Sequence, residues 1–353
     1  MIYINGRFLT HPIAGIPRFS YEMCRALCRS GREITVVAPA YAPRKEYPFP
    51  VEYYGKRKSH LWEQVDLYRF MKGKNNALLI SFSGLGPVLY KNHWPTIHDL
   101  SFWRHPEWFS FSYTLFYRIV TPILVRRAVA VLTVSQFSKS EVIDLLKIKE
   151  DKITIVSNAV SPKLCPKPNE AEQVISDWNE RYVLMVSARD QRKNFSRTAQ
   201  AFLSLNQEDV KLYIVGDSGT VFKEKGLFDF HHPSIKLLGR ISDEALSHYY
   251  RHALLFAYPS LYEGFGLPPI EAMANGCPVL VSDIEPLREV CGDAAYYCDP
   301  NDTASIAEGM KALLTDDRLR KDLKEKGLQQ IKNYSWEQSA QKIQTLLDKT
   351  GYL

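Results

Sequence analysis

The sequence predicts an α/β protein with two doubly wound parallel sheets, each in its own domain. Short apolar runs alternate with longer segments of helical periodicity along the 353 residues, which is the pattern of parallel strands joined by helices. A proline-bearing stretch, residues 161–173, interrupts the alternation once, and the same alternation then resumes. We therefore expect one domain over residues 1–165, a second over residues 166–335, and a last helix over residues 336–353 that packs back toward the first domain.

The strands of the first domain are predicted from apolar runs that are too short for helices. These runs comprise residues 2–5, 33–39, 77–83, 95–100, 130–135 and 152–160, and residues 18–28 have the periodicity of a helix. The predicted strands of the second domain are the similar apolar runs at residues 182–188, 210–216, 235–240, 254–260, 278–283 and 294–300. Because ligands of open parallel sheets bind beyond the carboxyl ends of the strands, we expect a site in a cleft between the two domains.

The composition indicates a globular protein of the cytoplasm, with 45% apolar and 24% charged residues. A strand-like run begins at Met1 without a basic segment that leads into an apolar one, so no signal or transit peptide is visible. The uncharged runs over residues 77–90 and 108–117 are shorter than the roughly 18 to 20 apolar residues of a membrane-spanning helix. The six cysteines form no C-x-x-C pair, which argues against a zinc cluster or a disulfide framework.

Positive charge is concentrated in the first half of the chain. Residues 1–160 carry 22 Lys or Arg against 12 Asp or Glu, and the remainder carries 23 against 27, which together give the net charge of +6. The basic clusters lie at residues 44–45, 56–58, 72–74 and 126–127. They form either a solvated face or a surface for an anionic acceptor or an anionic membrane, which would hold the protein peripherally on the inner face of the cytoplasmic membrane. Nucleic acid is not an expected partner, because no recognisable RNA- or DNA-binding motif accompanies these charges.

The stretch PSLYEGFGLPPIEAMANGCPV, residues 259–279, places Glu263 and Glu271 eight positions apart in a predicted strand, glycine loop and helix. Pro268 or Pro269 opens the helix, whose free N–H groups attract anions such as a phosphate. Carboxylates instead accept hydrogen bonds, which adjacent sugar hydroxyls supply, so the stretch predicts a sugar-nucleotide site. The alternative is that Glu271 only complements the helix dipole from the first turn and that the other glutamate is a solvated loop residue.

At this stretch the sequence resembles the retaining glycosyltransferases of GT-B architecture, the large nucleotide-sugar family in which two glutamates stand eight residues apart. The resemblance implies two Rossmann-like domains that face each other across a cleft. It implies that Glu263 acts in catalysis beside the donor hexose and that Glu271 holds the nucleotide ribose. The loop residues that the resemblance assigns to the donor are Gly264, Phe265, Gly266 and Leu267.

Two further motifs of the second domain match the family. VSARDQRKNF resembles the segment whose basic residues hold the leaving diphosphate, a role that falls to Lys193 and then to Arg192, with Asn194 as a helix cap. LLGRISDEAL resembles the segment whose backbone meets the nucleotide base, here Gly239, Arg240 and Ile241.

The first domain contributes two candidates by the same resemblance. AGIPRFSYEM is similar to the family's glycine loop, which makes Gly15 a candidate for close approach to the donor diphosphate, although Pro17 stands where relatives often have glycine. TIHDLSFWRHPEWF matches the segment that places His98, at the end of a strand, near the reacting centre and in a catalytic role. A structural role is the alternative for a lone histidine.

The missing motifs narrow the chemistry. No D-x-D occurs, so we expect no metal and no other cofactor, with cationic side chains and helix N-terminal amides stabilising the diphosphate. His248 and His252 have zinc-ligand spacing but no evident third ligand. P-loop, G-x-G-x-x-G and G-x-S-x-G motifs are also missing, so the usual sequence signals of a kinase, a dehydrogenase and a hydrolase are not found.

We therefore predict a retaining, metal-independent hexosyltransferase of cell-surface polysaccharide synthesis, similar to bacterial mannosyltransferases of O-chains and capsules. GDP-mannose is the first choice of donor, ahead of UDP-hexoses and a dTDP-deoxyhexose, and the acceptor is a glycan or a lipid-linked saccharide. Two alternatives remain open: a non-catalytic sugar-nucleotide-binding subunit of a polysaccharide assembly complex, and a UDP-sugar epimerase of the same fold.

Overall fold

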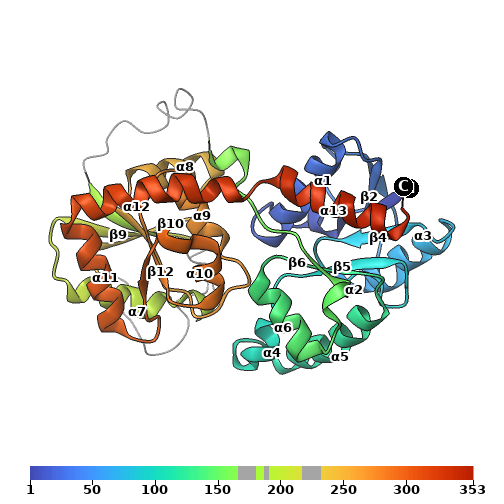
Figure 1. Ribbon diagram of the computed structural model, residues 1–353, viewed down its shortest axis with the longest axis horizontal. Coiled ribbons are helices and arrows are strands. Elements are labelled where there is room, and N and C mark those ends of the chain that lie inside the picture. The colour runs from blue at the N-terminus through green and yellow to red at the C-terminus, as the bar shows by residue number, and fades with distance from the viewer. Residues whose placement is uncertain (166–179, 187–190, 217–231, 353) are drawn as a thin grey trace. The chain divides into compact units, whose positions relative to one another are not determined.

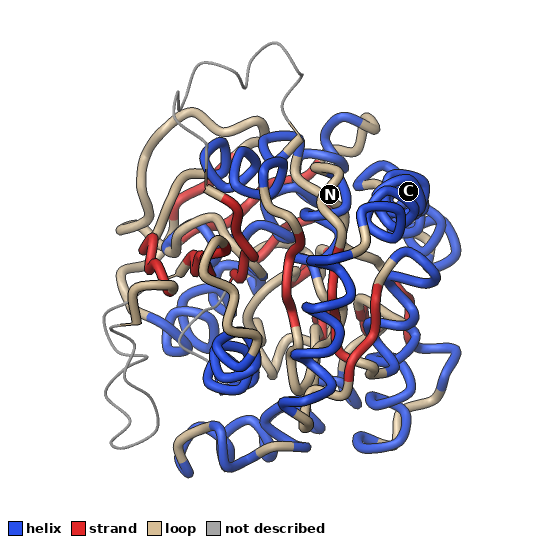
Figure 2. Tube along the Cα trace, turned by 90° about the vertical axis from the view of Figure 1, so that its left-hand side faces the viewer, coloured by secondary structure: helices blue, strands red, loops and turns tan. Residues whose placement is uncertain are grey.

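The computed structural model describes residues 1–165, 180–186, 191–216 and 232–352. The chain forms two compact units, one built from Met1–Asn158 with Tyr334–Leu353 and the other from Ala159–Asn333. In each unit the strands lie among helices that cover the sheet (Figure 1, Figure 2). The predicted α/β class with two parallel sheets is confirmed. Within the described residues, every helix is too short or too polar to span a bilayer.

The first unit contains a seven-stranded sheet in the order β3-β2-β1-β4-β5-β6-β7, in which all neighbouring strands are parallel. Its strands are β1 (Ile2–Asn5), β2 (Ile34–Ala38), β3 (Val51–Tyr53), β4 (Leu78–Ser81), β5 (His93–Ile97), β6 (Val131–Thr133) and β7 (Ile153–Ile155). The strand order reverses direction at β1 and β4, which is where ligands of such sheets gather.

Two details of this sheet differ from the sequence-based prediction. Strand β3 was not predicted, because its three residues lie at the sheet edge, are partly or fully exposed and include Glu52. Strand β5 begins at His93 rather than at residue 95, because His93 and Trp94 are both fully buried. The polar imidazole at 93 broke the apolar run in the sequence.

Helices cover the first sheet. They are α1 (Ile16–Arg29), α2 (Ser59–Leu61), α3 (Tyr68–Lys72), α4 (Ser101–Arg104), α5 (Phe111–Arg127), α6 (Gln136–Leu146) and α13 (Trp336–Thr350), with the π-helix η2 (Trp62–Leu67) and the short 3₁₀ turns η1 (Gly6–Thr10), η3 (Pro106–Trp108) and η4 (Glu150–Lys152). The terminal helix α13 packs beside α1, where the Trp336 ring meets the Phe19 ring at 5.8 Å (Figure 1). The Ser339 hydroxyl also donates to the Ser157 carbonyl at 2.7 Å, so α13 belongs to the first unit.

The second unit contains a six-stranded parallel sheet in the order β10-β9-β8-β11-β12-β13. Its strands are β8 (Arg181–Val186), β9 (Val210–Val215), β10 (Ile235–Gly239), β11 (Leu255–Tyr258), β12 (Val279–Ser282) and β13 (Tyr296–Cys298). Its helices are α7 (Phe195–Ser204), α8 (Asp243–His252), α9 (Leu267–Ala274), α10 (Glu285–Cys291), α11 (Thr303–Thr315) and α12 (Asp317–Gln330), with the short turns η5 (Pro162–Leu164), η7 (Gln191–Lys193), η8 (Gly292–Ala294) and η9 (Ile331–Asn333). All six predicted strands of this domain are confirmed.

The proline-bearing stretch predicted as the linker lies partly outside the described residues. Its described portion includes η5, which packs on α8 in the second unit. Residues 187–190, which precede Lys193 in the predicted strand-loop-helix opening, also lie outside the described residues.

Candidate functional site

A glycine loop joins β11 to α9 in the second unit, as the sequence predicted. Helix α9 starts at Leu267 with prolines in its first turn and ends at Ala274, just before Gly276. Gly266 stands at the N-cap with φ +92°, and a β-carbon there would lie 2.4 Å from the Leu287 side chain. Only glycine fits both the backbone angle and the space, so the loop can turn sharply into the helix.

Glu263 lies in this loop and is held by three donors. Its Oε1 atom lies 2.6 Å from the Lys193 ammonium, 2.7 Å from the Tyr258 hydroxyl and 2.5 Å from the Ser260 hydroxyl. Lys193 also donates to the Tyr258 hydroxyl. Glu263, Tyr258 and Ser260 are buried, which excludes the alternative of a solvated loop glutamate. All three contacts use one carboxylate oxygen, so Oε2 is not engaged by them.

The surroundings keep Glu263 ionised. Burial opposes ionisation, but the charges of Lys193 and Arg192 and the hydrogen bonds from Lys193 and Ser260 outweigh it, so the pKa of Glu263 is lowered. Burial and the adjacent carboxylate raise the pKa of the Tyr258 hydroxyl well above its usual range. At neutral pH the cluster therefore contains an ionised carboxylate and a protonated phenol.

The segment around Lys193 is fastened to the glycine loop by backbone contacts. The Arg192 carbonyl accepts the Leu261 N–H at 2.7 Å and the Ser260 hydroxyl at 3.0 Å. Two predicted diphosphate-binding residues are thus joined to the loop that carries Glu263, although about 70 residues of sequence separate them.

Asn194 is the N-cap residue of α7, as predicted, although its side chain makes no capping hydrogen bond. The residue has a left-handed backbone with φ 55°, and its amide donates to the Pro259 carbonyl at 2.9 Å and to the Pro300 carbonyl at 2.6 Å. The side chain therefore holds the loop after β11, and its Oδ1 also accepts from the Arg197 guanidinium in the first turn of α7 at 2.9 Å.

Glu271 lies in the second turn of α9 and is buried. Because the first turn contains no acidic residue, the interpretation that Glu271 only complements the dipole from that turn is wrong. The Tyr250 hydroxyl lies 3.5 Å from Oε2 of Glu271, and Asn275 donates to the Glu271 carbonyl at 2.8 Å. Asn275 also donates to the Leu164 carbonyl at 2.7 Å, which holds η5 beside the C-terminal end of α9.

The predicted base-binding segment lies at the end of another strand of the same sheet. Gly239 ends β10 with φ +67°, and apart from its chain neighbours no atom of the described residues lies within 4 Å of a β-carbon placed on it. Arg240 is exposed and Ile241 is partly exposed. Because all strands of this sheet are parallel, the end of β10 lies at the same edge of the sheet as the end of β11, which leads to Glu263.

Gly15 and His98 belong to the first unit. Gly15 is the N-cap of α1 with φ +54°, and Pro17 occupies the first turn of the helix. Apart from its chain neighbours, no atom in the described part of the chain lies within 4 Å of a β-carbon placed on Gly15. His98 follows β5, where its Nε2 lies 2.8 Å from the Phe82 carbonyl and its ring meets the Phe19 ring at 5.0 Å. Burial lowers the pKa of His98, although the Phe82 carbonyl and Asp99 act in the opposite sense, so the ring is neutral at pH 7.

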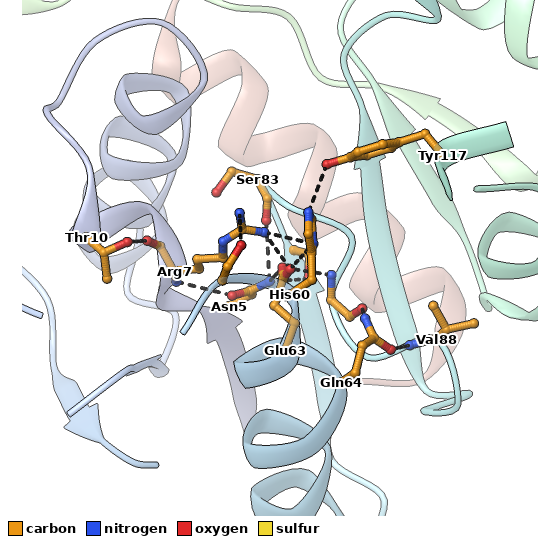
Figure 3. A network of polar contacts seen from close by, with 12 residues as sticks. Asn5, Arg7, Thr10, His60, Glu63, Gln64, Ser83, Val88 and Tyr117 are labelled. Atoms are coloured by element: carbon orange, nitrogen blue, oxygen red, sulfur yellow. Dashed lines mark hydrogen bonds and ion pairs between the residues drawn. The ribbon is translucent and has the colours of Figure 1, made fainter. Parts of the chain in front are cut away.

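Sequence reasoning missed a buried polar network at the carboxyl ends of β1 and β4 (Figure 3). Glu63, on η2, is fully buried and pairs with the Arg7 guanidinium at 2.6 Å and with His60 Nδ1 at 3.1 Å. The Asn5 amide donates to Oε1 of Glu63 at 2.9 Å and to the Ser83 carbonyl at 3.4 Å. Asn5 is the last residue of a buried strand and was the only sequence signal for this network, but nothing in the sequence indicated that Glu63 is its partner.

This network holds the segment that leads to His98. The Gly86 N–H donates to Glu63 at 3.0 Å, and a β-carbon on Gly84 would lie 2.2 Å from the same carboxylate. The adjacent Phe82 carbonyl is the partner of the His98 ring. The buried carboxylate therefore fixes the backbone that orients the candidate catalytic histidine.

The described residues contain no group of three or more side chains suited to hold a metal ion. His248 and His252 stack on each other at 4.1 Å, and Nδ1 of His252 lies 2.9 Å from the His248 carbonyl. His248 is buried and His252 is exposed, so the stacked rings join a buried position of α8 to an exposed one.

Two family models match the chain. The model of "Glycosyltransferase Family 4" matches residues 13–164, and that of "Glycosyl transferases group 1" matches residues 166–330. The chain is 30% identical to the O-antigen chain mannosyltransferase B of Escherichia coli, over 93% of this chain and 94% of that protein.

Solved structures match along almost the full length of both chains. Sucrose-phosphate synthase from Thermosynechococcus elongatus has a TM-score of 0.80 and 18% identity over 99% of each chain. Anabaena Alr3699/HepE in complex with UDP-glucose has a TM-score of 0.75 and 18% identity, also over 99% of each chain. At these identities the two structures bear on the fold alone.

Proposed function

Because the chain belongs to the group 1 glycosyl transferases, we propose that it moves mannose from GDP-mannose to a hydroxyl of a glycan or lipid-linked saccharide, with retention of configuration and without a metal. Cell-surface polysaccharide synthesis is the proposed setting, and the name of the E. coli relative supports both the sugar and the setting. The observation that carries the donor site is the buried Lys193–Glu263 pair, fastened to a glycine loop that opens a helix.

Each donor group has a fitting partner in this proposal. Lys193 and Arg192, together with the backbone N–H of Leu267 at the start of α9, would hold the diphosphate. Glu271 would accept hydrogen bonds from the ribose, and Glu263 would face the hexose through its Oε2 atom. Gly239 leaves space beside the backbone of residues 239–241 for the base.

The contacts of Glu263 favour an electrostatic role over a covalent one. A carboxylate that is paired with an ammonium group and accepts two hydroxyl hydrogen bonds on the same oxygen is a weak nucleophile. Its negative charge instead stabilises the positive character that the hexose gains as its bond to phosphate lengthens. The departing phosphate would then accept the proton of the attacking hydroxyl on the same face of the sugar.

The protein is proposed to work on the inner face of the cytoplasmic membrane. The basic residues of the first half supply the attraction, because each Lys or Arg near an anionic lipid surface contributes about 1 kcal/mol. A lipid-linked acceptor would then be presented at the same surface.

A thermal-shift panel with GDP-, UDP-, dTDP- and ADP-sugars tests the donor, since a bound donor stabilises the folded protein by RT ln(1 + [L]/Kd) and so raises the melting temperature. GDP-mannose is expected to give the largest shift, and a larger shift with another donor overturns the choice of sugar. Product formation with an acceptor distinguishes the enzyme from a non-catalytic binding subunit. Conversion of a UDP-sugar without any acceptor would instead identify an epimerase.

Turnover is expected to continue unchanged in excess EDTA, because Lys193 and Arg192 supply the cationic charge that a metal would otherwise bring to the diphosphate. Initial rates with and without EDTA measure this, with a magnesium-dependent glycosyltransferase as the positive control. Loss of activity that magnesium or manganese restores would contradict metal independence.

Replacing Lys193 by alanine is expected to raise the donor Kd about tenfold and to lower transfer about 100-fold, because the diphosphate charge is present before reaction and grows as the bond breaks. The variant also loses the partner of a buried carboxylate, so its melting temperature is expected to fall.

Two further variants separate these effects. Lys193→Arg keeps the charge and should retain more activity than the alanine variant. Lys326→Ala removes an exposed ammonium group that is paired with Asp322 on α12, and it should change neither property. Normal donor binding in folded Lys193→Ala protein would remove this lysine from the site.

A further inference from the structure

Helix α5 presents an apolar face to solvent. Its buried residues include two threonines and are Thr114, Thr121, Leu124 and Val125. Five large apolar side chains on the opposite face are exposed, and together they form the α5 stripe: Phe111, Leu115, Phe116, Ile119 and Ile123. The residues at 111, 115, 119 and 123 are four positions apart and therefore lie along one side of the helix. Phe111 is 82% exposed and Ile119 is 53% exposed.

Residues outside the stripe make most of the contacts that anchor the helix. Ser110 caps its first turn by accepting the Tyr113 N–H at 3.3 Å, and Arg118 donates to the Trp103 carbonyl at 2.8 Å. The Tyr117 ring packs against the Phe102 ring at 5.3 Å. The last two contacts join α5 to α4, which lies beside it (Figure 1). Within the α5 stripe, the Phe116 ring contacts the His60 ring at 5.1 Å. The exposure of the other four apolar side chains needs another explanation.

The charges of α5 match an anionic surface. Its 17 residues include no Asp or Glu, and Arg126 and Arg127 are exposed at its C-terminal end. An exposed helix with an aromatic and aliphatic face and arginines beside it has the composition of helices that lie in the membrane interface. A second copy of the chain would present the same acid-free helix and would offer these arginines no opposite charge.

We propose that the α5 stripe inserts into the headgroup region of an anionic lipid bilayer, with Arg126 and Arg127 contacting lipid phosphates. The inference rests on the membrane attachment proposed above and extends it, because it assigns the attachment to one helix and adds an apolar contribution to the charge. Binding through the α5 stripe persists in part at high salt, whereas attachment by charge alone is screened.

Sedimentation with vesicles of phosphatidylcholine, with and without phosphatidylglycerol, tests the proposal. The wild type is expected to bind the anionic vesicles and to retain part of its binding in about 0.5 M salt, at which exposed charges are screened within a few ångströms. The triple variant Leu115→Gln, Ile119→Gln and Ile123→Gln is expected to bind at least about tenfold more weakly, because the apolar area that enters the interface is lost. Glutamine is a good helix former, so the helix should remain intact.

Two control variants test whether binding depends on the α5 stripe itself or on any exposed apolar or basic residue. Leu328→Gln removes an exposed leucine from α12 and should leave binding unchanged. The double variant Arg126→Gln and Arg127→Gln should weaken binding to anionic vesicles by about tenfold while changing binding to neutral vesicles little. Circular dichroism of all variants checks that the fold is retained.

Three outcomes overturn the proposal. The first is wild-type binding by the triple glutamine variant. The second is binding that high salt abolishes completely, which would leave the charge-based attachment intact. The third is the absence of vesicle binding together with a dimer that the triple variant dissociates, which would make the α5 stripe a self-association face. Transfer to a soluble acceptor should be unchanged in every variant, so a failure of this inference is distinguishable from a failure of the proposed transfer reaction.

Discussion

Glu263→Gln is expected to lower turnover about 100-fold or more while leaving the affinity for nucleoside diphosphate nearly intact. The amide keeps the size of the side chain and can still accept from Tyr258 and Ser260, but it removes the negative charge. That charge matters most when the hexose becomes positive in the transition state. The effect should therefore fall on turnover rather than on ground-state binding.

Glu271→Gln provides the matched comparison, because both glutamates are buried in the same loop-helix segment. The ribose does not change during the reaction, so the loss of this contact should raise the Michaelis constant more than it lowers turnover. Free nucleoside diphosphate should also bind this variant more weakly.

Calorimetry with the nucleoside diphosphate and steady-state kinetics with the full donor measure the two effects on both variants. If both variants lose nucleotide affinity equally, or if Glu263→Gln turns over normally, the assignment of one glutamate to the hexose and the other to the ribose is wrong. The two carboxylates would then be structural elements of the loop.

Glu63→Ala is expected to lower the free energy of unfolding by about 3 to 5 kcal/mol, the usual loss when one partner of a buried ion pair is removed. The change leaves the Arg7 guanidinium and the Asn5 amide without their carboxylate and releases the Gly86 N–H. Urea unfolding at neutral pH measures the loss. Glu150→Ala is the control, because Glu150 is exposed and its ion pair with Lys139 should contribute little to stability.

The pH dependence gives a second test of the Glu63 network. Burial opposes ionisation of this carboxyl, but His60, Arg7, Asn5 and Gly86 outweigh it, so the pKa of Glu63 in the folded state lies below its ordinary value of 4.5. A lowered folded-state pKa means that the stabilisation is fully present above pH 4.5 and is lost as the pH falls through the folded-state value. The difference in stability between wild type and Glu63→Ala should therefore shrink only in acid. A loss at neutral pH no larger than that of Glu150→Ala would show that the network contributes little.

The strand pattern and the donor-loop motif were predictable from the sequence, because both depend on local properties. Twelve apolar runs became strands of two parallel sheets, since short runs bounded by polar residues can be buried in little else. The turn at Gly266 and the start of α9 followed from glycine and proline geometry, which neighbouring residues alone determine. Strand β3 escaped prediction because an edge strand with an exposed glutamate does not require an apolar run.

Side-chain partners were decided only by the tertiary structure. The sequence proposed Lys193 and Glu263 for separate donor groups, and the fold places their charged atoms 2.6 Å apart because two parallel strands end at the same edge of the sheet. Asn194 stands at the N-cap of α7 as predicted, but only the fold shows that its amide donates to two carbonyls more than 60 residues away. Glu63 gave no sequence signal, because a buried carboxylate is recognised only when its cationic partner is known.

The exposed face of α5 was likewise decided only by the tertiary structure. The sequence of α5 is apolar on almost every side, so periodicity alone could not tell which face the core covers. Packing against α4 and the sheet buried the face with two threonines and left Phe111 and Ile119 exposed. Local chemistry therefore determined the strands, the glycine loop and the residue types of the site. Contacts between residues distant in the sequence determined which charges are paired, which carboxylates are buried and which apolar face remains open to a partner.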